Sequence, residues 1–179
     1  MAVTRVVSMD DAEVLANELL ANREFLAPWT PIRPDDYFTA EVQRAVVAKE
    51  LDAYAREVML PLVILDGSGQ LAGRIHLNGI TRGAFQSASL GYWVSQARNG
   101  RGLASAAVAE VIDIAFESLG LHRLQAETVL YNVRSQRVLT RNGFTPFAVA
   151  PSYIQIAGEW QDHIMFQLLN NKSAGTAAN

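Results

Sequence analysis

The sequence predicts a single α/β domain in which a mixed sheet carries helices on both faces. Strand-like and helix-like segments alternate along most of the chain, which is typical of this class. The 179 residues suffice for one sizeable core, and half of them are hydrophobic while 18% are charged. We expect the domain to span residues 1–169, and the small polar residues 170–179 to form a disordered tail.

The first third of the chain is predicted to be mainly helical. A short strand over residues 3–8 precedes a helix that Ser8 caps, and acidic residues in its first turn favour the positive helix end. A second, short helix spans 22–26 and ends before Pro28. An alanine-rich helix with mixed charges follows over 37–56.

The rest of the chain alternates strands with two helices. We expect strands over 59–66, 70–80, 86–95, 122–129, 144–150 and 153–169, the last with a turn near residues 157–158. We expect helices over 101–119 and 133–142, each followed by a glycine that serves as a C-terminal cap.

The junction between the strand 86–95 and the helix 101–119 is the most informative segment. Gly100 and Gly102 let the backbone approach a ligand, and the first N–H groups of the helix have no partner within it. Those donors and the helix dipole favour an anion such as phosphate, and Arg98 and Arg101 add positive charge. The alternatives are a purely structural turn and solvated arginines. Ser105 occupies the third glycine position of the dinucleotide pattern, so that pattern is incomplete.

Composition excludes several classes of function. The absence of cysteine rules out disulfides, thiolate metal sites and a cysteine nucleophile, and the three histidines form no metal pattern. A net charge of −3 without a basic tail argues against direct binding of nucleic acid. We find no signal peptide and no apolar run of membrane-spanning length. We therefore expect a cytoplasmic protein with no metal and no membrane partner.

Several motifs occur in a fixed order along nearly the whole chain. They are Gly91-Tyr92-Trp93-Val94, Gly100-Arg101-Gly102-Leu103-Ala104, Leu121-His122-Arg123, Asn132-x-x-Ser135-x-Arg137-Val138-Leu139, Asn142-Gly143-Phe144 and Gly158-Glu159-Trp160. Together they resemble the GNAT superfamily of N-acetyltransferases. More closely, they resemble its ribosomal-protein alanine N-acetyltransferase group, the RimJ/RimL type.

The resemblance implies a mostly antiparallel mixed sheet with one parallel pair of strands that splay apart. The pantetheine arm of acetyl-CoA is expected to enter that opening, with its pyrophosphate on the amides of residues 100–104. The family usually has Gln or Arg where this chain has Asn99, and the neighbouring Arg98 compensates for the shorter side chain. The expected cofactor contacts are Val94, Arg98, Asn99, Gly100, Arg101, Gly102, Leu103, Ala104, Asn132, Ser135 and Arg141.

The resemblance also implies catalytic roles. The Val94 N–H is the expected oxyanion donor, and Glu127, five residues before Asn132, is the expected general base. Strand alternation permits Glu127 to face the cleft, although a surface or ion-paired glutamate is the alternative. Many family members have a tyrosine acid where this chain has Leu139, so Ser135 is the expected donor or relay, with a helix cap as its alternative role. Asn132 is expected to bond either the pantetheine or the first turn of the following helix.

Two functions follow for the chain. The first is an acetyl-CoA-dependent N-acetyltransferase that acts directly on a primary amine, either a protein N-terminus or a small amine. The second is a non-catalytic acyl-CoA sensor or partner-binding module on the same fold. The aromatic residues expected at the acceptor are Trp29, Tyr37, Tyr153 and Trp160. An exposed last strand would allow a homodimer.

Overall fold

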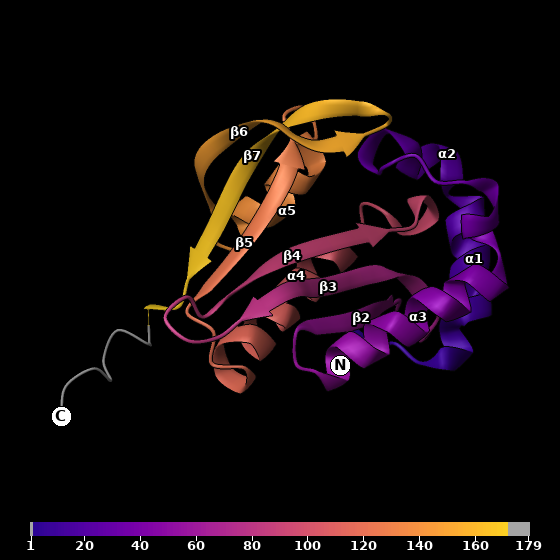
Figure 1. Ribbon diagram of the computed structural model, residues 1–179, viewed down its shortest axis with the longest axis horizontal. Coiled ribbons are helices and arrows are strands. Elements are labelled where there is room, and N and C mark those ends of the chain that lie inside the picture. Colours follow the sequence, from indigo (N-terminus) through magenta and orange to yellow (C-terminus); the bar gives the residue numbers. More distant parts are fainter. Residues whose placement is uncertain (1, 172–179) are drawn as a thin grey trace.

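A computed structural model describes residues 2–171 and contains one seven-stranded sheet in the order β1-β2-β3-β4-β5-β7-β6 (Figure 1). Its strands are β1 (Thr4–Val6), β2 (Met59–Leu65), β3 (Leu71–Thr81), β4 (Ser87–Val94), β5 (Arg123–Val129), β6 (Thr145–Ile156) and β7 (Glu159–Leu169). All neighbouring strands are antiparallel except β4 and β5. Within residues 2–171, no helix is long and apolar enough to cross a membrane.

Helices cover both faces of the sheet, as predicted. On one side lie α1 (Ala12–Ala21) and α3 (Ala40–Ala55), and on the other lie α4 (Leu103–Asp113) and α5 (Val133–Arg141) (Figure 1). The short helix α2 (Arg23–Leu26) follows α1. Single turns of 3-10 helix complete the structure at η1 (Met9–Asp11), η2 (Ala27–Trp29), η3 (Asp35–Phe38) and η4 (Gln96–Arg98), and a π-helical turn, η5 (Ile114–Ser118), extends α4.

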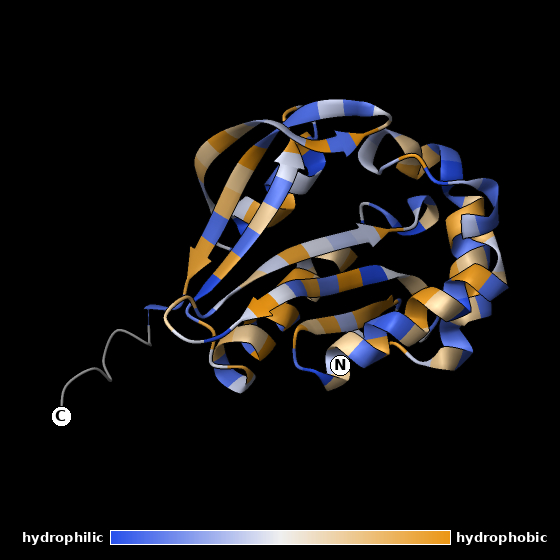
Figure 2. Ribbon diagram, in the orientation of Figure 1, coloured by the Kyte–Doolittle hydropathy of each residue, from blue (hydrophilic) through white to orange (hydrophobic). Residues whose placement is uncertain are grey.

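Strand alternation divides the buried side chains between two cores. Ile75 and Leu77 of β3 join the larger core beneath α4, which also includes Val108. Val63 of β2 faces the opposite way, into a smaller core with Leu15 of α1 and Val47 of α3. Because both faces of β2 are covered, this strand lacks polar side chains, whereas the other strands mix hydrophobic and polar residues (Figure 2).

The parallel strands β4 and β5 pair over only three residues each, beginning at Ser87 with Arg123 and ending at Ser89 with Gln125. Both strands continue beyond that point, β4 to Val94 and β5 to Val129, and they diverge as they do so (Figure 1). The expected splay is therefore present. It leaves the backbone groups at the end of β4 that point toward β5 without a partner strand.

Some local predictions need correction. Thr39 interrupts the predicted helix over 37–56, because its hydroxyl accepts a hydrogen bond from the Val42 N–H and caps α3. Ser8 is the N-cap in a capping box, but of the 3-10 turn η1 that precedes α1, and the Asp11 carboxylate accepts hydrogen bonds from the Ser8 N–H and hydroxyl. The break predicted at residues 151–152 is only an irregularity in register within β6.

The C-terminal end of the sheet also differs from expectation. The last strand, β7, lies between β5 and β6, so β6 is the edge strand. Asn170, predicted to start a disordered tail, is buried, and its backbone and side-chain amides donate to the carbonyls of His122 and Leu121. Residues 172–179 of the predicted tail lie outside the described residues.

Candidate functional site

The glycine turn before α4 forms an open cradle of backbone. Gly102 is the N-cap of α4 with φ +77°, a conformation that favours glycine, and no side chain caps the helix there. A Cβ at Gly100 or Gly102 would meet no atom within 4 Å. The turn borders a cavity of about 530 Å³, so an anion has room to reach the first N–H groups of α4.

Three arginines of α5 complete this cavity. Arg134, Arg137 and Arg141 all line it, opposite the glycine turn. Their spacing of three and four residues places them on one face of a helix. Only Arg141 was predicted as a cofactor contact. The helical spacing of the three arginines is the sequence signal that could have grouped Arg134 and Arg137 with Arg141.

The residues preceding the glycine turn anchor it to the rest of the domain. The Arg98 guanidinium donates to Asp66 at 2.9 Å and to Glu18 at 3.1 Å. Buried Asn22 accepts a hydrogen bond from the Gln96 N–H at 2.7 Å. Arg98 still borders the cavity, but its two carboxylate partners give it a structural role that the sequence did not reveal.

The other predicted contacts in the turn differ in their surroundings. Asn99 lines both the arginine cavity and the groove that continues from it, together with Ala104. Leu103 borders the arginine cavity alone. Arg101 is exposed and is not among the residues that line either space. Cofactor binding by Arg101 stays a prediction.

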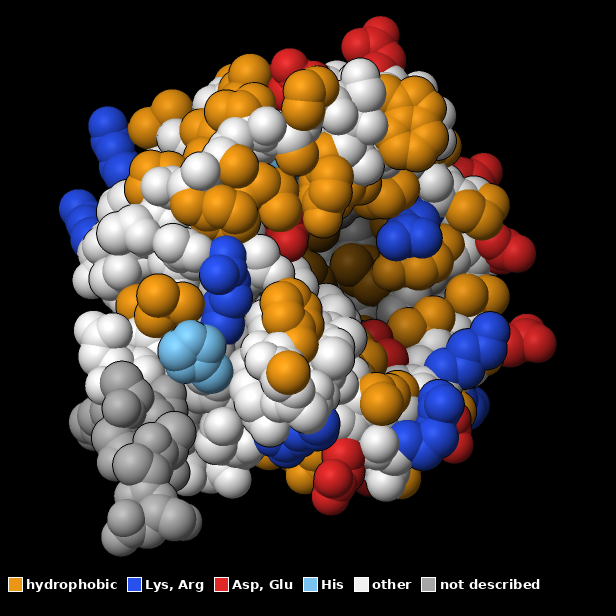
Figure 3. Space-filling model, turned by 60° about the vertical axis from the view of Figure 1, so that its left-hand side comes forward, with side chains coloured by type: hydrophobic (Ala, Val, Ile, Leu, Met, Phe, Trp, Pro, Cys, Tyr) orange, Lys and Arg blue, Asp and Glu red, His pale blue; other side chains and the backbone are white. Residues whose placement is uncertain are grey.

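A groove of about 570 Å³ continues from the arginine cavity toward the splay. Aromatic side chains dominate its far end, where the Trp29 and Tyr131 rings lie 5.6 Å apart, centroid to centroid. These two rings come from η2 and from the loop after β5, so they meet across the groove. Figure 3 shows a hollow in one face of the molecule, bordered largely by hydrophobic side chains with basic side chains nearby.

The Val94 N–H is directed into the splay. The next residue, Ser95, donates its N–H to the carbonyl of Ala72 in β3. Because successive backbone groups in a strand point to opposite edges, the Val94 N–H points away from β3 and toward β5. The pairing of β4 with β5 ends at Ser89, so this N–H is placed to donate to a ligand in the splay.

Glu127 of β5 lies at the splay in a partly buried position. The Ser89 hydroxyl of β4 lies 2.9 and 3.1 Å from its two carboxylate oxygens. Burial raises the pKa of the Glu127 carboxyl, while the hydrogen bond from Ser89 and the nearby His163 oppose that shift. Glu127 lines a cavity of about 160 Å³ and has no ion-pair partner among residues 2–171. The surface-glutamate interpretation therefore does not describe it.

Tyr92 and Ser135 form a hydroxyl pair across the splay. The Tyr92 Oη lies 2.8 Å from the Ser135 Oγ and 3.2 Å from the Ser135 carbonyl oxygen. Burial raises the pKa of the Tyr92 phenol to about 12, so the phenol remains protonated near neutral pH. The Ser135 N–H donates to the Asn132 side chain at 3.1 Å, so Asn132, and not Ser135, caps α5. Sequence reasoning did not select Tyr92, because the pair joins strand β4 to a helix 43 residues later.

Both the base candidate and the hydroxyl pair line the same small cavity. Glu127, Tyr92 and Ser135 border it, with Asn132 and Trp29. Tyr92 packs against the core beneath α4, whereas Glu127 alternates with the core residues Leu124 and Ala126 and so faces the side of α1 and α3. At the splay, side chains from the two opposite faces of the sheet therefore reach the same small cavity.

The four aromatic residues predicted at the acceptor are dispersed. Trp29 lines the groove, and Tyr37 lines a separate cavity near α3. Tyr153 stacks edge-on against His163 with centroids 5.7 Å apart, and burial, together with the charge of Glu127, raises the Tyr153 pKa. Trp160 is 64% exposed and is not among the residues that line these cavities. Their acceptor role stays a prediction.

The connected spaces fit a ligand with an anionic end and a narrow arm. The glycine cradle and the α5 arginines suit phosphates, and the apolar groove suits a slender chain that ends at the Val94 N–H. Acetyl-CoA has this form. The fit rests on the open cradle at Gly100 and Gly102 and on the arginine cavity beside it.

Comparisons with known proteins agree with this geometry. The family model of the acetyltransferase (GNAT) domain matches residues 3–145. The chain is 35% identical over 167 residues to a Bacillus subtilis protein named as a probable N-acetyltransferase, YjcK, covering 93% of this chain and 92% of the relative. It is 29% identical to the Escherichia coli [ribosomal protein uS5]-alanine N-acetyltransferase, covering 93% and 86%. It also resembles Mycobacterium smegmatis RimJ in complex with CoA-disulfide, with a TM-score of 0.90, 30% identity and coverage of 94% and 82%.

Proposed function

Because the chain belongs to the GNAT family of acetyltransferases, we propose that its acceptor is the N-terminal amine of a protein. As an N-acetyltransferase it uses acetyl-CoA, which supplies an acetyl group activated as a thioester. Names of relatives support the choice of acceptor, since the Escherichia coli relative is named for the alanine of ribosomal protein uS5. A ribosomal protein is therefore the first acceptor to test.

Glu127 takes the proton that the acceptor amine loses as it reacts. A carboxylate whose pKa is raised by burial is a stronger base than an exposed one, which suits this task. Ser89 holds the carboxylate through its hydroxyl, with oxygen separations of 2.9 and 3.1 Å. The Val94 N–H supplies the donor for the developing oxyanion, because it points into the splay.

Ser135 supplies a hydroxyl on the opposite face, and Tyr92 orients it. As the C–N bond forms and the C–S bond breaks, the Ser135 hydroxyl donates to the leaving thiolate of coenzyme A. A serine hydroxyl by itself is a poor acid, so the Tyr92 phenol at 2.8 Å donates in turn to the Ser135 oxygen. Leu139, at the position of the usual family tyrosine, is fully buried in the core and lines the same small cavity. Tyr92 thus provides the phenol that this position lacks.

One observation carries the proposal: Glu127 and the Tyr92–Ser135 pair border one cavity at the splay. The test is acetyl-CoA turnover, read as release of free thiol, with N-terminal peptides, polyamines, amino acids and aminoglycosides as acceptors. We expect turnover with peptides whose N-terminal amine is free and none when that amine is blocked. Turnover with small amines alone would overturn the choice of acceptor.

A homodimer in the cytoplasm is the remaining part of this proposal. The edge strand β6 exposes Phe147 and Val149 beside unpaired backbone groups, and such an edge favours pairing with a second chain. A charged residue there should block pairing, so Val149→Lys is expected to halve the mass measured by sedimentation. An unchanged mass would contradict a dimer through β6.

A further inference from the structure

A second cavity, of about 400 Å³, lies on the other face of the sheet from α4 and α5. Arg74 and His76 of β3 form its floor, because they alternate with Ile75 and Leu77, which face the α4 core. The cavity shares Leu26 and Trp93 with the groove that leads to the splay. It is therefore positioned beside the reaction centre, on the side that Glu127 faces.

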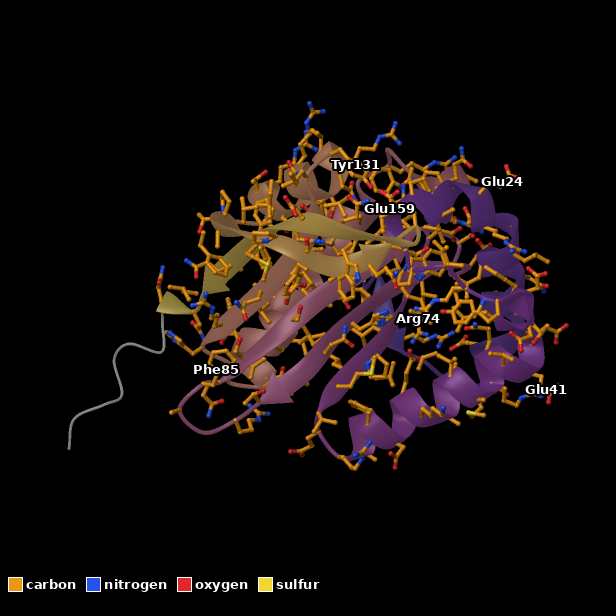
Figure 4. The ribbon with its side chains drawn as sticks, turned by 45° about the horizontal axis from the view of Figure 1, so that its top comes forward. Glu24, Glu41, Arg74, Phe85, Tyr131 and Glu159 are labelled. Atoms are coloured by element: carbon orange, nitrogen blue, oxygen red, sulfur yellow. The ribbon has the colours of Figure 1, made fainter. Side chains whose placement is uncertain are left out.

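The floor of this cavity is polar and carries no net charge. Arg74 is buried, and its guanidinium donates two hydrogen bonds to the Glu50 carboxylate of α3, at 3.2 and 2.5 Å. Figure 4 shows Arg74 between the sheet and the helical layer. Burial, together with the charge of Arg74, lowers the pKa of His76 to about 3, so His76 is neutral at physiological pH.

The rim of the cavity is cationic. The Arg33 guanidinium lies over the Tyr37 ring at 4.8 Å, and the Arg23 guanidinium lies over the Phe38 ring at 4.7 Å. Arg23 also pairs with Asp35 at 2.7 Å, but the Asp35 side chain is 88% exposed, so water weakens that attraction. Arg33 has no carboxylate partner within residues 2–171.

A guanidinium that lies over an aromatic ring is attracted through its charge and keeps its N–H groups for other partners. Arg33 can therefore still bind a planar, bidentate anion while it lies over the Tyr37 ring. This positive rim contrasts with the net charge of −3 for the whole chain. Carboxylate is the anion that matches such a fork and is common in peptides.

Resting on the proposed peptide acceptor, we propose that this second cavity selects acceptors with a carboxylate side chain near the reactive amine. Where the sheet is paired, two strand spacings, about 10 Å, separate β3 from β5, and the splay widens this gap toward Glu127. An extended peptide advances about 3.3–3.6 Å per residue, so an acidic side chain two or three residues from the amine spans a distance of this order. Polyamines, which are cationic, are then poor acceptors.

The test uses C-terminally amidated tripeptides that differ only in one side chain. Each pair carries Glu or Gln at the second or the third residue, and acetyl-CoA turnover gives kcat/KM for every peptide. We expect kcat/KM about tenfold higher for the Glu peptide of at least one pair, because a hydrogen bond between charged groups favours it. Arg33→Gln should abolish this ratio, and 0.5 M salt should reduce it.

Arg56→Gln is the matched control, because Arg56 is an exposed arginine at the end of α3 whose partner is Asp52. It should leave the Glu-to-Gln ratio as in the wild type. Calorimetry of the acetylated tripeptides with coenzyme A provides a readout that needs no turnover, and Glu products should bind more tightly than Gln products. Circular dichroism checks that Arg33→Gln is folded.

The outcomes separate this inference from the proposed function. Equal turnover and equal product affinity for Glu and Gln peptides would overturn the inference and leave a peptide N-acetyltransferase. A ratio that survives Arg33→Gln would also overturn it, because another site would then read the carboxylate. Turnover of polyamines but not of peptides would overturn both the inference and the proposed peptide acceptor.

Discussion

The phenol of Tyr92 and the hydroxyl of Ser135 lie 2.8 Å apart, although one belongs to β4 and the other to α5. This contact ties the strand that borders the splay to the helix that carries three arginines of the arginine cavity. The splay and the arginine cavity are thereby held in a fixed relation. The pair also supplies a protonated phenol to the cavity that Leu139, at the usual family tyrosine position, lines as well.

Replacing Tyr92 by Phe should lower kcat about fivefold, the effect of losing one hydrogen bond of about 1 kcal/mol. The KM for acetyl-CoA should change little, because the groove keeps its shape. Ser135→Ala should have a similar effect, and the double variant should be no slower than the slower single variant. Steady-state kinetics of the three variants tests this. Independent, multiplying effects would show that the two hydroxyls do not act together.

Glu127→Gln should lower kcat about 10²–10³-fold, because the amide cannot accept the amine proton. Thiol release with the best acceptor measures this loss. Asp52→Asn, which changes an exposed carboxylate on α3, is the control and should leave the rate as it is. A Glu127→Gln enzyme of full activity would exclude this residue as the base.

The pH dependence gives a separate test of Glu127. Because its pKa is raised, Glu127 becomes protonated at a higher pH than an ordinary glutamate does when the solution is acidified. Activity should fall as the carboxylate is protonated. Ser89→Ala removes the hydrogen bond that lowers this pKa, so the acid limb of kcat/KM should move to higher pH. A limb that stays in place would mean that another group controls it.

Gly102→Glu should abolish binding of coenzyme A, measured by calorimetry. The new side chain would enter the phosphate cradle and repel the pyrophosphate, and it would strain a backbone with φ +77°. Gly69→Glu is a matched control, since Gly69 has φ +79° and equally open surroundings but lies in the turn between β2 and β3. Equal affinities for the two variants would place the phosphates elsewhere.

Arg137→Gln should weaken coenzyme A binding about tenfold, and the wild-type affinity should fall with added salt. Arg134→Gln should act in the same direction. Arg44→Gln, on the exposed surface of α3, serves as the control. Loss of affinity in the control as well would indicate a general effect of net charge and not a phosphate site.

Local features made the glycine turn and most elements predictable from the sequence. Gly100 and Gly102 precede an apolar helix, and this order alone indicated the cradle, because helix starts and positive φ depend on neighbouring residues. Glu127 could be placed on one face of its strand by alternation. Its partner Ser89 could not, since it lies 38 residues away on a parallel strand.

The sequence by itself therefore determined the family and the fold class, and it predicted the glycine turn and the candidate residues of the reaction. Only the tertiary structure decided which groups meet: Tyr92 with Ser135, Ser89 with Glu127, and Arg74 with Glu50 across 24 residues. It also placed β7 inside the sheet and β6 at its edge. The physical reason is that side-chain pairs across a sheet depend on strand order, register and splay, which long-range packing fixes and no local pattern encodes.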